Sequence, residues 1–143
     1  MIEEKKLSHL FGNAALAAKD THELFYPIKR GVIEDWNYME LIWSYIFEEL
    51  NLETKNVNVL MTDSPFNKKE KRQRMSQILF EKFKVKSLAI MNTAALSMYS
   101  TGRVSGLIAQ SGEGHSYTVP IFEGYALAHA QINREIAGQD VTK

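Results

Sequence analysis

Apolar and polar positions alternate along this chain with helical spacing in some stretches and strand spacing in others. Between residues 38 and 50, apolar side chains recur every three or four positions, which is the spacing of a helix face. Asn37 is predicted to cap this helix, with Glu40 completing a capping box three residues later. Further apolar residues widen the stripe almost all round, so we expect the helix to be buried on several sides. The apolar positions are Tyr38, Met39, Leu41, Ile42, Trp43, Tyr45, Ile46, Phe47 and Leu50.

The middle of the chain predicts an alternation of strands and helices. A β-branched apolar run at 57–62 and a short one at 88–91 are typical of strands, because their length and composition suit a buried sheet. Helices are expected at 68–83 and 93–99, the second capped by Asn92 and ended by Gly102. Met75, Ile78, Leu79 and Phe83 form the predicted core stripe of the first of these helices. Strands that alternate with helices favour an α/β fold with parallel pairing.

The last third of the chain predicts a β-hairpin. Strands at 104–110 and 115–120 flank the sequence Ser111, Gly112, Glu113 and Gly114, whose glycines we expect to supply the positive φ of the turn. Such a turn can direct backbone N–H groups inward around a phosphate, although glycine turns often serve only as connections. We therefore divide the chain into a poorly patterned segment (1–25), a helix-strand-helix-strand-helix unit (26–103) and a hairpin unit (104–143).

Composition narrows the function classes. The 143 residues are 45% apolar and 24% charged, as in an ordered globular domain of one core. Cysteine is absent, which excludes disulfides, thiolate metal sites and a thiol nucleophile. The 17 basic and 17 acidic residues cancel, whereas a nucleic-acid-binding protein needs a basic excess. We expect no nucleic-acid partner.

No targeting or membrane segment is predicted. Residues 7–18 are loosely apolar, but Glu3 and Glu4 stand where a signal peptide carries positive charge. No stretch reaches the roughly 18 apolar residues of a membrane helix. We expect a cytoplasmic protein without membrane contact.

The remaining charged residues suggest no site by themselves. The basic run from Lys68 to Arg74 is interpreted as the solvated face of a helix, because Glu70 interrupts it and no aromatic residues are interleaved. The histidines share no metal-binding spacing, so no metal is expected. They are His9, His22, His115 and His129. No Ser-His-Asp order or Gly-x-Ser-x-Gly elbow is present.

Four segments together make the sequence recognisable. They are Tyr26–Trp36 (YPIKRGVIEDW), Val59–Asn67 (VLMTDSPFN), Ala95–Arg103 (ALSMYSTGR) and Gly106–Ala130 (GLIAQSGEGHSYTVPIFEGYALAHA). In this order they resemble the actin and actin-related protein family, and the last resembles that family's second phosphate hairpin. The resemblance runs in register from about Phe11 to Thr142, with a one-residue slip near Leu50. It covers an internal part of a much longer family member and lacks that family's first phosphate loop.

The resemblance implies a partial actin-like, ribonuclease-H-like ATPase fold, a mixed sheet with crossover helices followed by a hairpin. It assigns any phosphate contact to Ser111, Gly112, Glu113 and Gly114. The family's magnesium-holding aspartate corresponds here to Gln110, which cannot balance a divalent cation. Its water-orienting glutamine corresponds to Thr93, whose side chain is too short for that role. Since phosphoryl transfer needs both parts, we expect no ATP hydrolysis, no catalytic residue and no cofactor.

Other positions near the hairpin depart from the family pattern as well. Arg30 stands where conventional actin carries a modified histidine, and Asn133, Glu135 and Gln139 replace the usual arginine, aspartate and arginine. The loss of two positive charges argues against an intact catalytic centre. Each replacement taken alone is also explained by sequence divergence that has no functional consequence.

The favoured function is a non-catalytic actin-related scaffold subunit of a larger cytoskeletal or ciliary assembly, located in the cytoplasm. Since the family's opening strands have no counterpart here, the strand at 57–62 should expose an edge that a protein partner completes. Self-polymerisation is not expected, because the family's filament surfaces are mostly missing. The alternatives are an ATP-binding module whose cleft another chain completes, and a fragment of a longer actin-like protein. The resemblance leaves the assembly unspecified and the nucleus open as a location.

Overall fold

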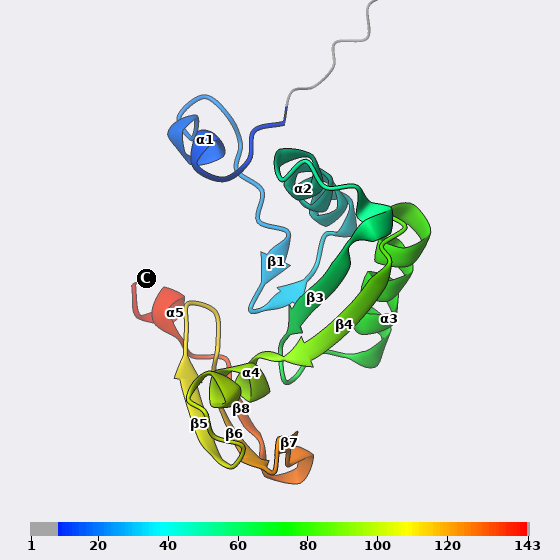
Figure 1. Ribbon diagram of the computed structural model, residues 1–143. Helices are drawn as coiled ribbons and strands as arrows, with labels where there is room; N and C mark the ends of the chain where they lie inside the picture. Colours follow the sequence, from blue (N-terminus) through cyan, green and yellow to red (C-terminus); the bar gives the residue numbers. More distant parts are fainter. Residues whose placement is uncertain (1–8, 143) are drawn as a thin grey trace, which may run out of the picture.

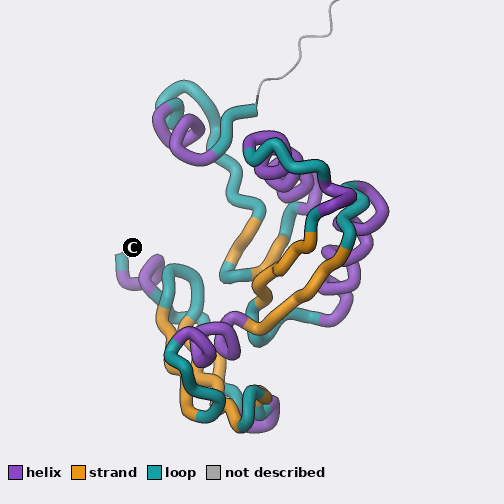
Figure 2. The backbone as a smooth tube through the Cα atoms, viewed as in Figure 1, coloured by secondary structure: helices purple, strands orange, loops and turns teal. Residues whose placement is uncertain are grey.

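The strands of the described residues form three separate small sheets with helices packed beside them (Figures 1 and 2). The structure is a computed structural model that describes residues 9–142. The strands are β1 (Ile28–Lys29), β2 (Val32–Ile33), β3 (Asn58–Asp63), β4 (Ser87–Asn92), β5 (Gly106–Ser111), β6 (Ser116–Phe122), β7 (Tyr125–Ala126) and β8 (Ile132–Arg134). The α-helices are α1 (Gly12–Ala17), α2 (Trp36–Glu49), α3 (Lys69–Gln77), α4 (Thr93–Ser100) and α5 (Gly138–Val141). Short 3₁₀ turns lie at Thr54–Asn56 and Ala128–Ala130.

Helix α2 begins earlier than the sequence predicts, and its predicted cap is wrong. The Asp35 carboxylate, rather than Asn37, accepts a hydrogen bond from the Tyr38 backbone N–H, at 3.1 Å. The carbonyl of Pro27 accepts from the amides of both Glu34 and Asp35, at 2.8 and 3.2 Å. These two bonds keep the chain extended through Asp35, so the helix starts at Trp36.

The predicted strand-helix-strand unit is confirmed. Strands β3 and β4 are parallel, with Val59 opposite Leu88 and Met61 opposite Ile90. Between them, α3 passes directly into a π-helical turn at Ile78–Lys82, which the sequence did not predict. The two other sheets are antiparallel and separate, so among residues 9–142 parallel pairing is confined to β3 and β4.

The first core lies between the β3–β4 sheet and the helices packed on one of its faces. Its buried residues are Ile33, Met39, Trp43, Met75, Ile78, Leu79 and Val85. Three of the four core positions predicted for the helix at 68–83 are at most 4% exposed, namely Met75, Ile78 and Leu79. Figure 1 shows α3 lying behind β4, consistent with helices covering one face of this sheet only.

The second core lies between α4 and the sheet of β5, β6, β7 and β8. Asn92 caps α4 as predicted, its side chain accepting from the Ala94 amide at 2.8 Å. The helix buries Ala94, Ala95 and Met98 against alternate residues of β6. These strand residues are Tyr117, Val119 and Ile121. Tyr117 therefore lies on the buried face of the hairpin.

The β3–β4 sheet is open at its edges and on one face. Within residues 9–142, each of its strands pairs only with the other. Val59 and Met61 pack toward the helices, and Leu60, which points to the opposite face, is 56% exposed. Helix α2 is likewise incompletely covered, since Tyr45, Ile46 and Leu50 are exposed. The unit thus presents apolar surface where a larger fold or a partner can pack.

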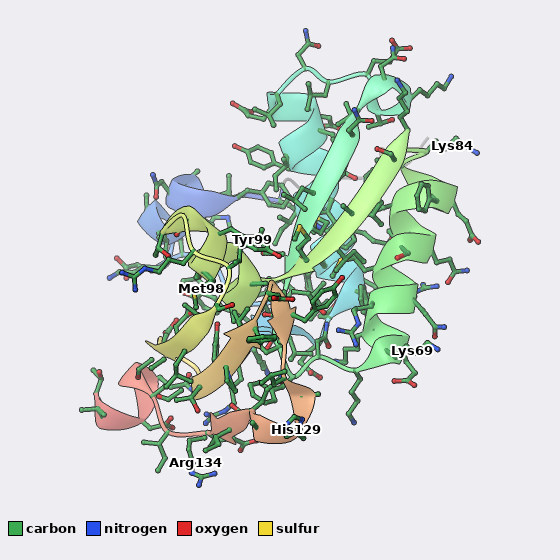
Figure 3. The ribbon with its side chains drawn as sticks, turned by 60° about the horizontal axis from the view of Figure 1, so that its bottom comes forward. Lys69, Lys84, Met98, Tyr99, His129 and Arg134 are labelled. Carbon is green, nitrogen blue, oxygen red and sulfur yellow. The ribbon has the colours of Figure 1, made fainter. Side chains whose placement is uncertain are left out.

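The basic run is engaged mainly within the molecule. Lys71 donates to Glu34 Oε1 at 2.8 Å and to the Ile33 carbonyl, and Arg72 pairs with buried Asp63 at 3.2 Å. Arg74 donates to the side chain of Gln77. Lys69, near the start of α3, and Lys84, just beyond its π-helical end, extend outward from the helix (Figure 3). The predicted solvated face is therefore correct only in part, because Lys71 and Arg72 hold the helix to Ile33, Glu34 and Asp63.

Candidate phosphate-binding hairpin

The hairpin of β5 and β6 forms the predicted turn, with a different role for its glycines. Ser111 pairs with Ser116, and the Gly112 amide donates to the His115 carbonyl at 3.3 Å. Neither Gly112 nor Gly114 has a positive φ, so the predicted backbone reason for these glycines is wrong. Gly114 is needed for space instead, because a Cβ there would lie 2.8 Å from the Cα of Arg30.

All three central carbonyls of the turn accept hydrogen bonds from distant segments. The Gly138 amide donates to Gly112 and the Gln139 amide to Glu113, both at 2.9 Å. The carbonyl of Gly114 accepts from Nη1 of Arg30 at 2.6 Å. The turn is therefore fixed on its carbonyl side by the β1–β2 turn and by the start of α5.

Two predicted positions, Thr93 and Gln110, are joined by a residue that the sequence analysis did not identify. The Tyr117 hydroxyl donates to Oε1 of Gln110 at 2.6 Å and lies 3.2 Å from the hydroxyl of Thr93. Since the phenol has one proton, Thr93 is the donor in the second bond. Tyr117 is 5% exposed. We call Thr93, Tyr117 and Gln110 the hydroxyl–amide trio.

The surroundings of Tyr117 keep the trio in place. Its ring stacks on His115 at a centroid distance of 5.3 Å and meets Phe66 edge-on at 6.0 Å. Thr93 is the first residue of α4, and Gln110 is paired with Tyr117 across the β5–β6 ladder. The trio thus ties the start of α4 to the part of the β5–β6 hairpin nearest its turn.

A cleft of 1090 Å³ opens beside the turn, between it and the β1–β2 hairpin. Gln110 and Tyr117 line it together with the turn itself. Charged residues from the facing segment are Lys29, Arg30 and Glu34. Two of the other positions that depart from the family pattern, Asn133 and Glu135, do not line the cleft. Glu135 accepts a hydrogen bond from Arg30 through its backbone carbonyl, and Asn133 lies in β8 opposite Tyr117. Gln139 lines the cleft and holds the turn through its amide.

The position that the resemblance assigns to the magnesium-holding aspartate is neutral and internally bonded here. Gln110 supplies no negative charge, and its carbonyl oxygen is already bonded to Tyr117. Within residues 9–142, no three His, Asp or Glu side chains gather into a group suited to a metal ion.

In the same part of the chain, no helix is both long enough and apolar enough to cross a membrane.

A parallel strand pair with its crossover helix, followed by a glycine-turn hairpin, is consistent with a partial actin-like fold. A family model described as Actin matches residues 2–143. Centractin of Saccharomyces cerevisiae is 41% identical over 146 residues, which cover 100% of this chain and 38% of centractin. The chain belongs to the actin family. It spans well under half the length of this curated relative.

Proposed function

We propose that this chain is a non-catalytic, actin-related structural subunit of a cytoskeletal protein assembly in the cytoplasm. The observation that carries this proposal is the hydroxyl–amide trio. Hydrolysis of ATP requires charge neutralisation by a metal and an oriented water molecule. At the corresponding positions, Gln110 and Thr93 bind Tyr117 instead, so their polar groups serve internal packing. Membership of the actin family and the likeness to centractin support a structural role.

The open β3–β4 sheet supports a protein partner. Its outer edges are unpaired within the described residues, and Leu60 presents an apolar side chain on the uncovered face. Exposed strand edges accept a further strand through backbone hydrogen bonds. We propose that a partner covers this face and adds a strand to one edge. Cilia are one setting in which such an assembly occurs among the resembled proteins.

A second candidate is an ATP-binding module whose cleft another chain completes. The 1090 Å³ cleft beside the glycine turn favours it, because a phosphate group has room there. This candidate differs from the first in one measurable respect, which is saturable nucleotide binding by the assembled complex.

The deciding experiment uses the assembly that contains this chain, purified gently from its source. Its native mass is measured first, then retained nucleotide after gel filtration, and then phosphate release from added Mg-ATP. We expect a native mass well above that of the single chain and no nucleotide bound in a one-to-one ratio with this chain. Phosphate release from Mg-ATP should not exceed that of a control without protein. One bound nucleotide per chain would establish the second candidate, and a lone chain with a sharp thermal transition would remove the scaffold proposal.

A further inference from the structure

The two-residue turn between β1 and β2 contains an arginine in a conformation that does not favour it. Arg30 has φ +48° and Gly31 has φ +74°, so both central residues are left-handed. Two-residue hairpin turns of this kind prefer asparagine or glycine, because a Cβ is crowded in that region. Residues in strained conformations persist where surrounding contacts fix them, so we expect the Arg30 side chain to make such contacts.

The guanidinium group of Arg30 joins segments that are far apart in the sequence. Its Nη1 donates to the carbonyls of Gly114 and Glu135, both at 2.6 Å. Its Nη2 donates to Oδ1 of Asp140 at 3.3 Å. These acceptors belong to the hairpin turn, to the segment after β8 and to α5. Hydrogen bonds from a charged donor are stronger than neutral ones, and the planar guanidinium fixes their directions.

The neighbouring backbone is packed to suit these bonds. A Cβ at Gly31 would lie 2.7 Å from Cε1 of the His115 side chain, and a Cβ at Gly114 would lie 2.8 Å from the Cα of Arg30, so the two turns are packed closely at both glycines. The second carboxylate oxygen of Asp140 accepts from the Ala137 amide at 3.1 Å, which orients the carboxylate toward Arg30. Both sides of the contact are therefore arranged around one side chain.

We propose that Arg30 is an internal clamp that orders the hairpin turn without any bound ligand. It ties the β1–β2 turn, residues 112–115 and residues 135–140 into one rigid junction. The proposal goes beyond the scaffold function and does not depend on the absence of nucleotide. Its consequence is that the cleft wall formed by the turn holds its shape through protein contacts alone.

The test compares the wild-type chain with Arg30→Asn and Arg30→Lys by hydrogen–deuterium exchange, in the purified assembly and in the full chain alone. Asparagine suits the left-handed turn position, so Arg30→Asn removes the clamp while keeping the turn. We expect amides of residues 112–116 and 135–140 to exchange about tenfold faster in Arg30→Asn, the effect of losing charge-assisted hydrogen bonds. Lysine keeps the positive charge but lacks the planar guanidinium that reaches several acceptors at once, so the effect of Arg30→Lys should be intermediate.

Amides of β3 provide the internal control, because none of the hydrogen bonds that form the junction involves this strand. Exchange in residues 112–116 within twofold of wild type, or equal acceleration in β3, would overturn the clamp. A parallel series with Mg-ATP separates this proposal from the previous one. If Mg-ATP slows exchange of the wild-type turn, the scaffold function without nucleotide is overturned, while a ligand-free difference between wild type and Arg30→Asn still supports the clamp.

Discussion

The Tyr117 hydroxyl donates to Oε1 of Gln110 at 2.6 Å, and so links the strand before the turn to the buried face of the strand after it. Replacing Tyr117 by phenylalanine keeps the ring and removes this bond and the one from Thr93. We expect the free energy of unfolding to fall by about 1 kcal/mol, the net value of such hydrogen bonds in a buried site. Urea unfolding of the full chain measures the change.

Tyr125→Phe is the matched control for Tyr117→Phe. Tyr125 is 78% exposed, so loss of its hydroxyl should change stability by less than about 0.5 kcal/mol. If both variants unfold at the same urea concentration as wild type, the trio contributes nothing to stability and the structural argument for it fails.

The longer helices and strands follow from local pattern, but the short strands β1, β2, β7 and β8 and the site do not. Asn92 is predicted correctly as a cap because it directly follows a strand and precedes a helical run. Asp35 displaces Asn37 because Pro27, eight residues earlier, binds the two amides before the helix. The space requirement of Gly114 comes from Arg30, 84 residues away. Such contacts leave no periodic signal in the sequence.

One signal for Tyr117 was present in the sequence. It alternates with Val119 and Ile121, which places its hydroxyl on the buried face of a strand. A buried hydroxyl needs a hydrogen-bond partner, so this residue was a candidate for a polar contact. The identity of its partners depends on how α4 docks on the hairpin, which only the structure provides.

Leu79→Ala should be among the most destabilising single changes in the first core. Leu79 lies in the π-helical turn and is 1% exposed, so truncation leaves a cavity that the surrounding helices cannot close fully. We expect a loss of roughly 2–5 kcal/mol. The adjacent residue gives the comparison, because Phe80 is 46% exposed and its change to alanine should cost at most about 1 kcal/mol. Equal losses in urea unfolding would contradict this placement of the core.

Leu60→Lys should weaken partner binding without unfolding the chain. A charged side chain on an exposed sheet face opposes packing and edge addition by another protein. We expect its affinity for the assembly to fall by at least about tenfold, the effect of charge in a buried interface centre. Leu107→Lys is the control, because Leu107 is 64% exposed on a different sheet. Sedimentation velocity measures both, and equal effects would show that the β3–β4 face is not the docking surface.

Glu34 gives a prediction about pH. The hydrogen bond from Lys71 and then its charge hold the pKa of the Glu34 carboxyl below its usual value, with smaller contributions from Lys29 and Lys68. Because the pKa is lowered in the folded state, the pair stabilises the protein above the unfolded-state pKa. This stabilisation is lost as the pH falls through the folded-state pKa. Carboxyl chemical shifts recorded by NMR should show a titration midpoint below that of an unfolded glutamate.

Lys71→Met should return the Glu34 midpoint toward its ordinary value, because methionine keeps much of the side-chain length and removes both the donor and the charge. Lys68→Met removes only a distant charge and should move the midpoint less. High salt should raise the midpoint in the wild type, since Glu34 is exposed and its attraction to lysine is screened. A midpoint that shifts equally in the two variants would mean that the direct bond at 2.8 Å does not form in solution.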